Sequence, residues 1–178
     1  MRANLRYFVF FFFLVVSHNF SQTNVQGTIN SNTTWSLHGS PYNITGSITI
    51  RDGATLTIES GVIVQFTTSS YITVGYNQSS KGNLIANGVS FKGLLTSDAR
   101  IYFKDNSASG TLENCSFDNT YLLIENNEIT ISNSSFSNCV YPIVFNDGGK
   151  AILSNIDILP SNSNFGIQFH GDITSDYT

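Results

Sequence analysis

The chain has 178 residues, a length typical of a single domain, and only 11% of these residues are charged. Its formal net charge is −4, with eight lysines and arginines in total. Nucleic acids and anionic membrane surfaces are bound through clustered basic side chains, so this balance disfavours both as partners.

Residues 1–21 have the order of charge and hydropathy that is typical of a secretory signal peptide. Arg2 and Arg6 are followed by an unbroken apolar run from Tyr7 to Val16, and then by polar residues. A membrane-spanning helix needs roughly 20 apolar residues, twice the length of this run, so a cleaved signal is favoured over a membrane anchor. With cleavage after Ser21 we expect a secreted or cell-surface protein that has no membrane span.

Residues 22–45 are rich in Thr, Ser and Asn and have Trp35 and Tyr42 as their large apolar anchors. Such a segment is too polar to form a core of its own. Stacked β structures need a cover over their open end, where strand edges and apolar side chains would otherwise be exposed. We therefore expect residues 22–45 to form an N-terminal cap, and residues 46–178 to form the stacked coils.

From Gly46 onward, short β-rich runs alternate with Gly and Ser. Ile or Leu alternates with Thr in the runs Ser47 to Ile50, Thr55 to Ile58 and Tyr71 to Val74, which is the period-2 pattern of half-buried strands. The pairs Asp52-Gly53 and Ser60-Gly61 indicate turns between them. Inward residues recur about every seven or eight positions, so three strands would complete a coil of about 22 residues.

One phrase, apolar-x-Asn-x-x-apolar, occurs three times, from Leu112 to Phe117, from Ile131 to Phe136 and from Leu153 to Ile158. Its asparagines are 19 and 22 residues apart, a period typical of stacked structural repeats. An antiparallel sandwich also has strands at short intervals, but it does not repeat one phrase in register. The sequence therefore predicts an all-β fold, a parallel β-helix (solenoid) of about six coils. The last coil begins at Phe165 and lacks its own copy of the phrase, so we expect it to be truncated.

The asparagine of the phrase has a structural role in this interpretation. A corner between two strands can require a left-handed backbone, which Asn tolerates better than most residues. Inward amides in successive coils could also bond to one another as a ladder. We expect this ladder to contain Asn87, Asn114, Asn133 and Asn155.

Aligning the first strand of each later coil places Ile101, Leu123, Ile143 and Ile167 in one inward column. Phe103, Phe145 and Phe169 form an aromatic column beside it, which Glu125 interrupts because a core cannot hold an unpaired carboxylate. Either the strand from Tyr121 to Glu125 shifts its register to bury Leu122 and Ile124, or the alignment is wrong there.

In that alignment the intervening residues point outward and form a candidate face for a polysaccharide or another surface protein, with a plain solvated sheet as the alternative. The apolar middle of the face would mark a contact site. The residues of this candidate face are Arg100, Tyr102, Lys104, Leu122, Ile124, Val144, Gln168 and His170.

The chain lacks the spacing expected of a catalytic, cofactor or metal site. Its carboxylates are dispersed, His170 has no visible nucleophile or metal partner, and no phosphate-binding loop or nucleophile elbow occurs. Cys115 and Cys139 lie four positions apart in coil register, about 13 Å of extended chain. This exceeds the Cα separation of about 7 Å that a disulfide permits, so two free thiols are favoured over a disulfide.

The chain resembles secreted bacterial right-handed parallel β-helix repeat proteins of the pectate-lyase-like kind. The residues that carry this resemblance are Gly53 to Val62 with Gln65 and Phe66, Trp35 and Ser40 to Tyr42 upstream, and the phrases Gly110 to Phe117 and Ile129 to Asn133. The resemblance implies right-handed coiling, and a scaffold that carries lyases, hydrolases, adhesins and passive stalks alike. We expect an exported structural or adhesive module, with the N-terminal fragment of a polysaccharide lyase or hydrolase as the alternative.

Overall fold

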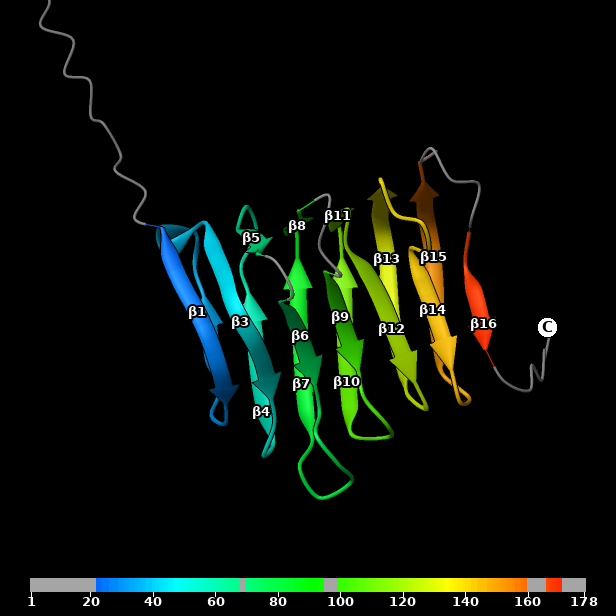
Figure 1. Cartoon of the computed structure of the whole chain (residues 1–178), viewed down its shortest axis with the longest axis horizontal. Coiled ribbons are helices and arrows are strands. Elements are labelled where there is room, and N and C mark those ends of the chain that lie inside the picture. The colour runs from blue at the N-terminus through cyan, green and yellow to red at the C-terminus, as the bar shows by residue number, and fades with distance from the viewer. Residues whose placement is uncertain (1–21, 68–69, 95–98, 160–165, 171–178) are drawn as a thin grey trace, which may run out of the picture.

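The protein is an all-parallel β-solenoid of about six turns (Figure 1). The computed structural model describes residues 22–67, 70–94, 99–159 and 166–170. Residues 1–21, the expected signal peptide, lie outside the described residues. Within the described residues, no helix is long and apolar enough to cross a bilayer. The sequence prediction of a parallel solenoid is confirmed.

Each coil contributes to three faces, which we number in the order in which the chain follows them. Face 1 contains β6 (Tyr71–Val74), β9 (Arg100–Phe103), β12 (Tyr121–Glu125), β14 (Ile143–Asn146) and β16 (Gln168–His170). Face 2 contains β2 (Thr33–Trp35), β4 (Ala54–Ile58), β7 (Gly82–Asn87) and β10 (Ala108–Glu113). Face 3 contains β5 (Ile63–Phe66), β8 (Ser90–Gly93) and β11 (Ser116–Asp118).

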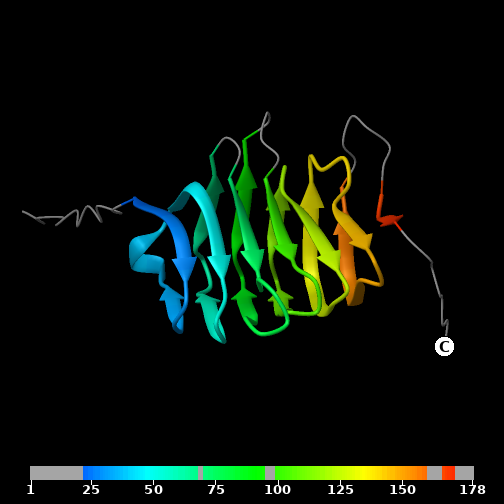
Figure 2. The ribbon, with the colours of Figure 1, turned by 60° about the horizontal axis from the view of Figure 1, so that its bottom comes forward.

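Four longer strands pass from one face to the next. β1 (Thr23–Ile29) and β3 (Tyr42–Ile50) run from face 3 into face 1, whereas β13 (Glu128–Ser137) and β15 (Lys150–Ile158) run from face 2 into face 3. A short 3-10 helix, η1 (Leu37–Gly39), follows β2. Successive coils stand side by side along the long axis (Figure 2). At about 4.8 Å per coil, six coils extend for about 29 Å.

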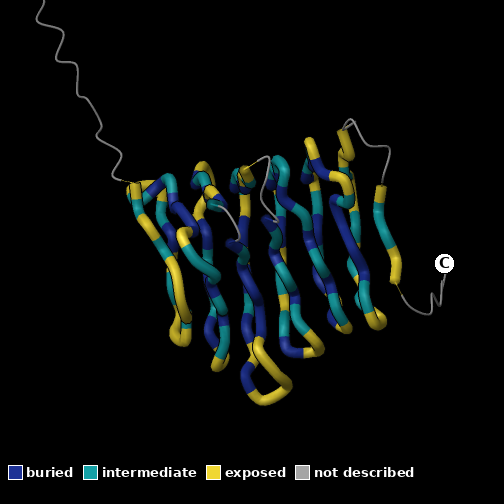
Figure 3. Tube along the Cα trace, viewed as in Figure 1, coloured by how far each residue is buried: buried dark blue, intermediate teal, exposed yellow. Residues whose placement is uncertain are grey.

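The core is a set of columns that run along the axis between the three faces. Alternate residues of each strand point inward, and parallel pairing places like residues on one another in neighbouring coils. On face 3, the rings of Phe91, Phe117 and Phe136 are stacked at centroid distances of 5.0 and 4.6 Å. The buried segments follow one another through the central coils, whereas the last coil is largely exposed or half-buried (Figure 3).

The first coil begins earlier than the sequence indicated. β1 pairs in parallel with β3, and β2 with β4, so residues from Thr23 onward already form a coil where a separate cap was expected. Trp35 and Tyr42 are buried as predicted, and their rings stack with centroids 4.7 Å apart. A polar strand can pair through its backbone as well as an apolar one, which is why composition alone misplaced the start of the solenoid.

The strand β12 takes the shifted register that was one of the two alternatives. Leu122 pairs with Ile101 and Ile124 with Phe103, and both side chains are fully buried. The expected outward orientation of Leu122 and Ile124 is therefore wrong, as is the inward position of Leu123. Glu125 follows as the pairing partner of Asn146 and stays half-buried, so the shift removes its carboxylate from the core.

The turn between faces 2 and 3 has the left-handed backbone that the asparagine pattern predicted. Asn114, Asn133 and Asn155 have φ values of 52°, 49° and 52°, and Gly61 and Gly88 occupy the same corner in earlier coils with φ of 82° and 67°. Asn87 lies one position before the corner and pairs with Glu113, so it is not a corner member.

The asparagine amides are exposed, which corrects the expectation that they point inward. They still bond along the axis: the amide Nδ2 of Asn114 donates to Oδ1 of Asn87, and that of Asn155 donates to Oδ1 of Asn133, both at 3.0 Å. The ladder therefore lies on the outer surface, because the left-handed residue turns its side chain away from the core and the next residue turns inward.

The inward residue after several of the left-handed asparagines is polar. The side chains of Cys115, Ser134, Thr120 and Cys139 each donate to the carbonyl oxygen two residues earlier, at 2.8 to 3.2 Å. Asn127 does the same with its amide. The carbonyl oxygens of Glu113, Ser132 and Ser137 also accept a backbone N–H from the neighbouring coil, so the side chain is their second hydrogen-bond partner. Cys115 and Cys139 are buried free thiols at different corners, as predicted, and Cys139 stacks on Thr120 where Asn119 was expected.

We expect Asn133→Leu to lower the free energy of unfolding by about 1–2 kcal/mol, because a branched side chain is strained at φ of 49°. The variant also loses the hydrogen bond that Nδ2 of Asn155 donates to Asn133, but this loss adds little to the destabilisation because the site is exposed. Asn133→Gly is the control, since glycine adopts this conformation freely. Urea titration of both variants measures the difference, and an equal loss in the two variants would contradict the role of the corner conformation.

Candidate functional site

The outer side of face 1 carries aromatic, aliphatic, charged and amide side chains. Strand alternation and the parallel register place one outward residue of each coil in a single column. This column contains Thr49, Thr73, Tyr102, Leu123, Val144 and Gln168. A neighbouring outward column contains Tyr71, Arg100 and Tyr121. The residues of the predicted face therefore divide between these columns, the corner that follows them, and the core.

On the coils of β6 and β9, the side chains of face 1 contact one another and their neighbours in adjacent coils. The guanidinium carbon of Arg100 lies 4.7 Å from the centre of the Tyr71 ring, a cation–π contact between adjacent coils. The hydroxyl of Tyr102 donates a hydrogen bond to Oε2 of Glu125. Burial, and then this carboxylate, raise the pKa of Tyr102 well above its usual range. Tyr102 therefore stays a neutral donor and is engaged with Glu125.

Tyr76 lies between two cations at the corner that follows face 1. The guanidinium carbon of Arg51 is 5.5 Å from the centre of its ring, and Nζ of Lys104 is 5.3 Å from it. About half of the Tyr76 side chain, 49%, is exposed. Lys104, a residue of the predicted face, is thus held at the corner next to the strand and not on the flat surface of the strand.

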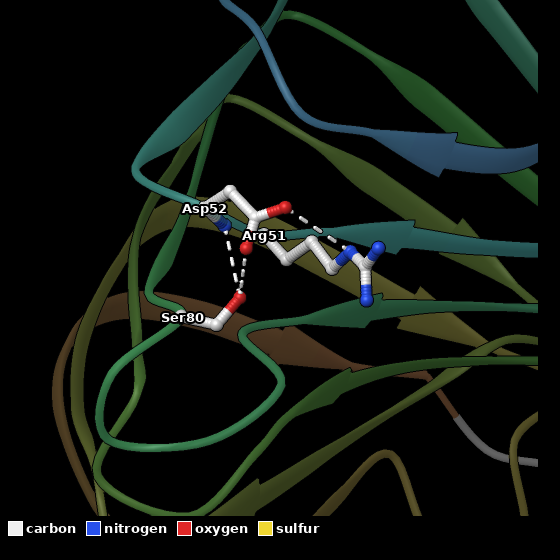
Figure 4. Close-up of polar contacts among 3 residues, drawn as sticks. All are labelled: Arg51, Asp52 and Ser80. Carbon is white, nitrogen blue, oxygen red and sulfur yellow. Dashed lines mark hydrogen bonds and ion pairs between the residues drawn. The ribbon is translucent and has the colours of Figure 1, made fainter.

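Arg51 is held in addition by its neighbour Asp52, in an ion pair of 3.3 Å between Nε and Oδ2 (Figure 4). The hydroxyl of Ser80 donates to Oδ1 of Asp52 and accepts from the Asp52 backbone N–H at 3.1 Å. These contacts tie the turn after β3 to the end of the loop in the next coil. The ion pair is partly exposed and contributes little to stability, so its main effect is to orient the corner.

The second half of the face contains an open groove of about 410 Å³. It extends across the coils of β12, β14 and β16 on the outer side of face 1, and over the corner that precedes them. Its walls combine aromatic and aliphatic side chains with a few neutral polar ones. The lining residues are Ala99, Asn119, Thr120, Tyr121, Leu123, Cys139, Val140, Tyr141, Val144 and Gln168.

The structure brings only part of the predicted face to this groove. Val144 and Gln168 line it, and Arg100 and Tyr102 lie on the preceding coil. Leu122 and Ile124 are in the core, as described above, and His170 pairs with Asn146 on the last strand. The residues that sequence reasoning missed are Leu123, which took the outward place of its neighbours, and the two tyrosines that begin the coils, Tyr121 and Tyr141. The sequence signal for the two tyrosines was their shared position, shortly after the corner in two successive coils.

The described residues do not form a metal site, since no three His, Cys, Asp or Glu side chains among them lie close enough to share an ion. Cys139 lines the groove as a neutral thiol, because burial and then the charge of Asp118 raise its pKa. Its Sγ donates to the carbonyl oxygens of Thr120 and Ser137. The arrangement is therefore suited to binding through contact and hydrogen bonds.

No family model, no curated protein and no solved structure matches the chain.

Proposed function

We propose that the protein is an exported, non-catalytic β-solenoid module that binds carbohydrate in the groove on face 1. The observation that carries this proposal is the pairing of Tyr121 and Tyr141 with neutral polar groups of Asn119, Thr120 and Gln168 in one groove. Export rests on the signal-like order of residues 1–21.

Sugars have faces of C–H groups and edges of hydroxyl groups, and the two kinds of lining residue suit these two parts. Aromatic rings offer a large apolar surface at low conformational cost, while amides and hydroxyls can both donate and accept hydrogen bonds. A volume of about 410 Å³ falls within the usual range of small-molecule sites.

The orientation of the groove favours an extended chain. Three successive coils contribute Leu123, Val144 and Gln168 to it, which corresponds to about 10 Å along the solenoid axis. A ligand that follows this axis meets a similar surface at each coil. We therefore expect oligosaccharides to bind more tightly than single sugars.

We expect Tyr141→Ala to weaken glycan binding at least about tenfold, because the variant loses an aromatic wall of the groove. A glycan array identifies the ligand, and isothermal titration of that ligand measures the loss. The matched control is Tyr76→Ala, which removes an exposed tyrosine outside the groove and should leave the affinity unchanged.

An array on which the wild-type protein binds no glycan would overturn the proposal. An equal effect of the two tyrosine variants would place binding outside the groove. Release of shorter fragments from any bound polysaccharide would contradict the non-catalytic part of the proposal and would favour a lyase or hydrolase.

A further inference from the structure

We infer that the carbohydrate bound in this groove is neutral, and that uronate-containing or sulfated polysaccharides are rejected. This inference rests on the proposed function and narrows it to a class of ligand. It is carried by one property of the groove: all ten lining residues have uncharged side chains.

A carboxylate or sulfate that enters such a groove loses part of its hydration without gaining a charged partner. Burial of an unpaired charge is far more costly than burial of a hydroxyl group, which the amides of Asn119 and Gln168 can satisfy. The apolar wall of Leu123, Val140 and Val144 increases this cost, because it offers no hydrogen bonds. A neutral sugar enters the groove without this cost of desolvating a charge.

The cations of face 1 lie outside the groove and have contacts of their own. Arg100 lies over Tyr71, and Lys104 lies over Tyr76, both on the coil before the groove. Both cations are thus held against aromatic rings of the coil before their own, and neither side chain lines the groove.

Arg100 directly follows the lining residue Ala99, so a cation and a carboxylate both flank the groove lining in sequence. Asp118 directly precedes the lining residue Asn119, and its Oδ1 accepts hydrogen bonds from Ser137 and Asn138 at 3.2 and 2.6 Å. Both donors are uncharged side chains. An anionic ligand would be repelled by this carboxylate, whereas a neutral ligand would not.

The test uses the glycan that the array identifies and the same oligosaccharide after oxidation of its primary hydroxyl groups to carboxylates. The two ligands then differ mainly in charge. We expect the oxidised form to bind the wild-type protein at least about tenfold more weakly. We also expect the affinity for the neutral form to be the same at low and high ionic strength, because no ion pair contributes.

A second variant tests whether the groove itself rejects the charge. Leu123→Arg places a cation in the groove and should increase the affinity for the oxidised oligosaccharide about tenfold over wild type. Thr49→Arg is the matched control, since Thr49 belongs to the same outward column three coils away. The control should keep the preference of the wild-type protein for the neutral over the oxidised oligosaccharide. Circular dichroism checks that both variants are folded.

The outcomes separate this inference from the function on which it rests. Binding of acidic glycans as tightly as neutral ones, or an equal gain from Leu123→Arg and Thr49→Arg, overturns the inference but leaves carbohydrate binding in place. An array without any bound glycan overturns the proposed function itself.

Discussion

Phe117→Ala is expected to lower the free energy of unfolding by about 3–5 kcal/mol. The Phe117 ring is fully buried and stacks on Phe91 at 5.0 Å and on Phe136 at 4.6 Å, with interplanar angles of 5° and 10°. Truncation removes the apolar surface of one ring and leaves a cavity between two others. Neither neighbour can close this gap, because the backbone ladder fixes the spacing of the coils at about 4.8 Å.

The control for this prediction is Phe169→Ala in the last coil. Phe169 also stacks on a phenylalanine, Phe145 at 4.9 Å, but 52% of its surface is exposed. Truncation of Phe169 should therefore lower the free energy of unfolding by far less than truncation of Phe117. Urea titration followed by circular dichroism measures both variants, and similar losses would show that the aromatic column does not stabilise the coils in the way proposed.

The periodic part of the fold was predictable because backbone pairing and side-chain alternation repeat with each coil. The phrase around Asn114 and its copies at Asn133 and Asn155 marks the same corner in three successive coils. A left-handed turn between two short strands leaves few residue types to choose from, so this corner is visible in the sequence. The coil length and the parallel stacking follow from it.

The orientation of individual side chains was less predictable, because it depends on register. In β12, a shift by one residue moves Leu122 and Ile124 into the core and Leu123 outward. Glu125 gave the signal for this shift, since its carboxylate cannot stay in the core. Composition cannot decide such a case when three consecutive residues, Leu122 to Ile124, are all apolar.

The groove was only partly predictable for the same reason. Val144 and Gln168 were assigned to an outward face from strand alternation, and both line the groove. Tyr121 is the first residue of β12, where the shift in register turns it outward together with Leu123, and Tyr141 lies in the corner two residues before β14. Residues next to a corner can lean over either face, and only the geometry of the coil decides which.

Raising the pH from about 9 to above 11 is expected to remove about 2–3 kcal/mol of stability through Cys115 alone. Burial raises the pKa of the Cys115 thiol from 9.0 to about 11. The neutral thiol donates to the carbonyl oxygens of Ala86 and Glu113, at 3.6 and 3.2 Å, and a thiolate could not donate to either.

The direction follows from the difference between the two states. The unfolded chain ionises its thiol near pH 9, whereas the folded chain resists ionisation until about pH 11. The stabilising contribution is therefore fully present below pH 9 and is lost as the pH rises through the folded value. Two pKa units correspond to about 2–3 kcal/mol.

Cys115→Ala isolates this contribution, because alanine cannot ionise and its cavity cost does not depend on pH. The stability advantage of the wild-type protein over the variant, measured by urea titration, should be constant up to about pH 8 and should then shrink by about 2–3 kcal/mol above pH 11. An advantage that stays constant across this range would mean that Cys115 ionises at the same pH in the folded and unfolded chain, and so that its corner is hydrated and not part of the core.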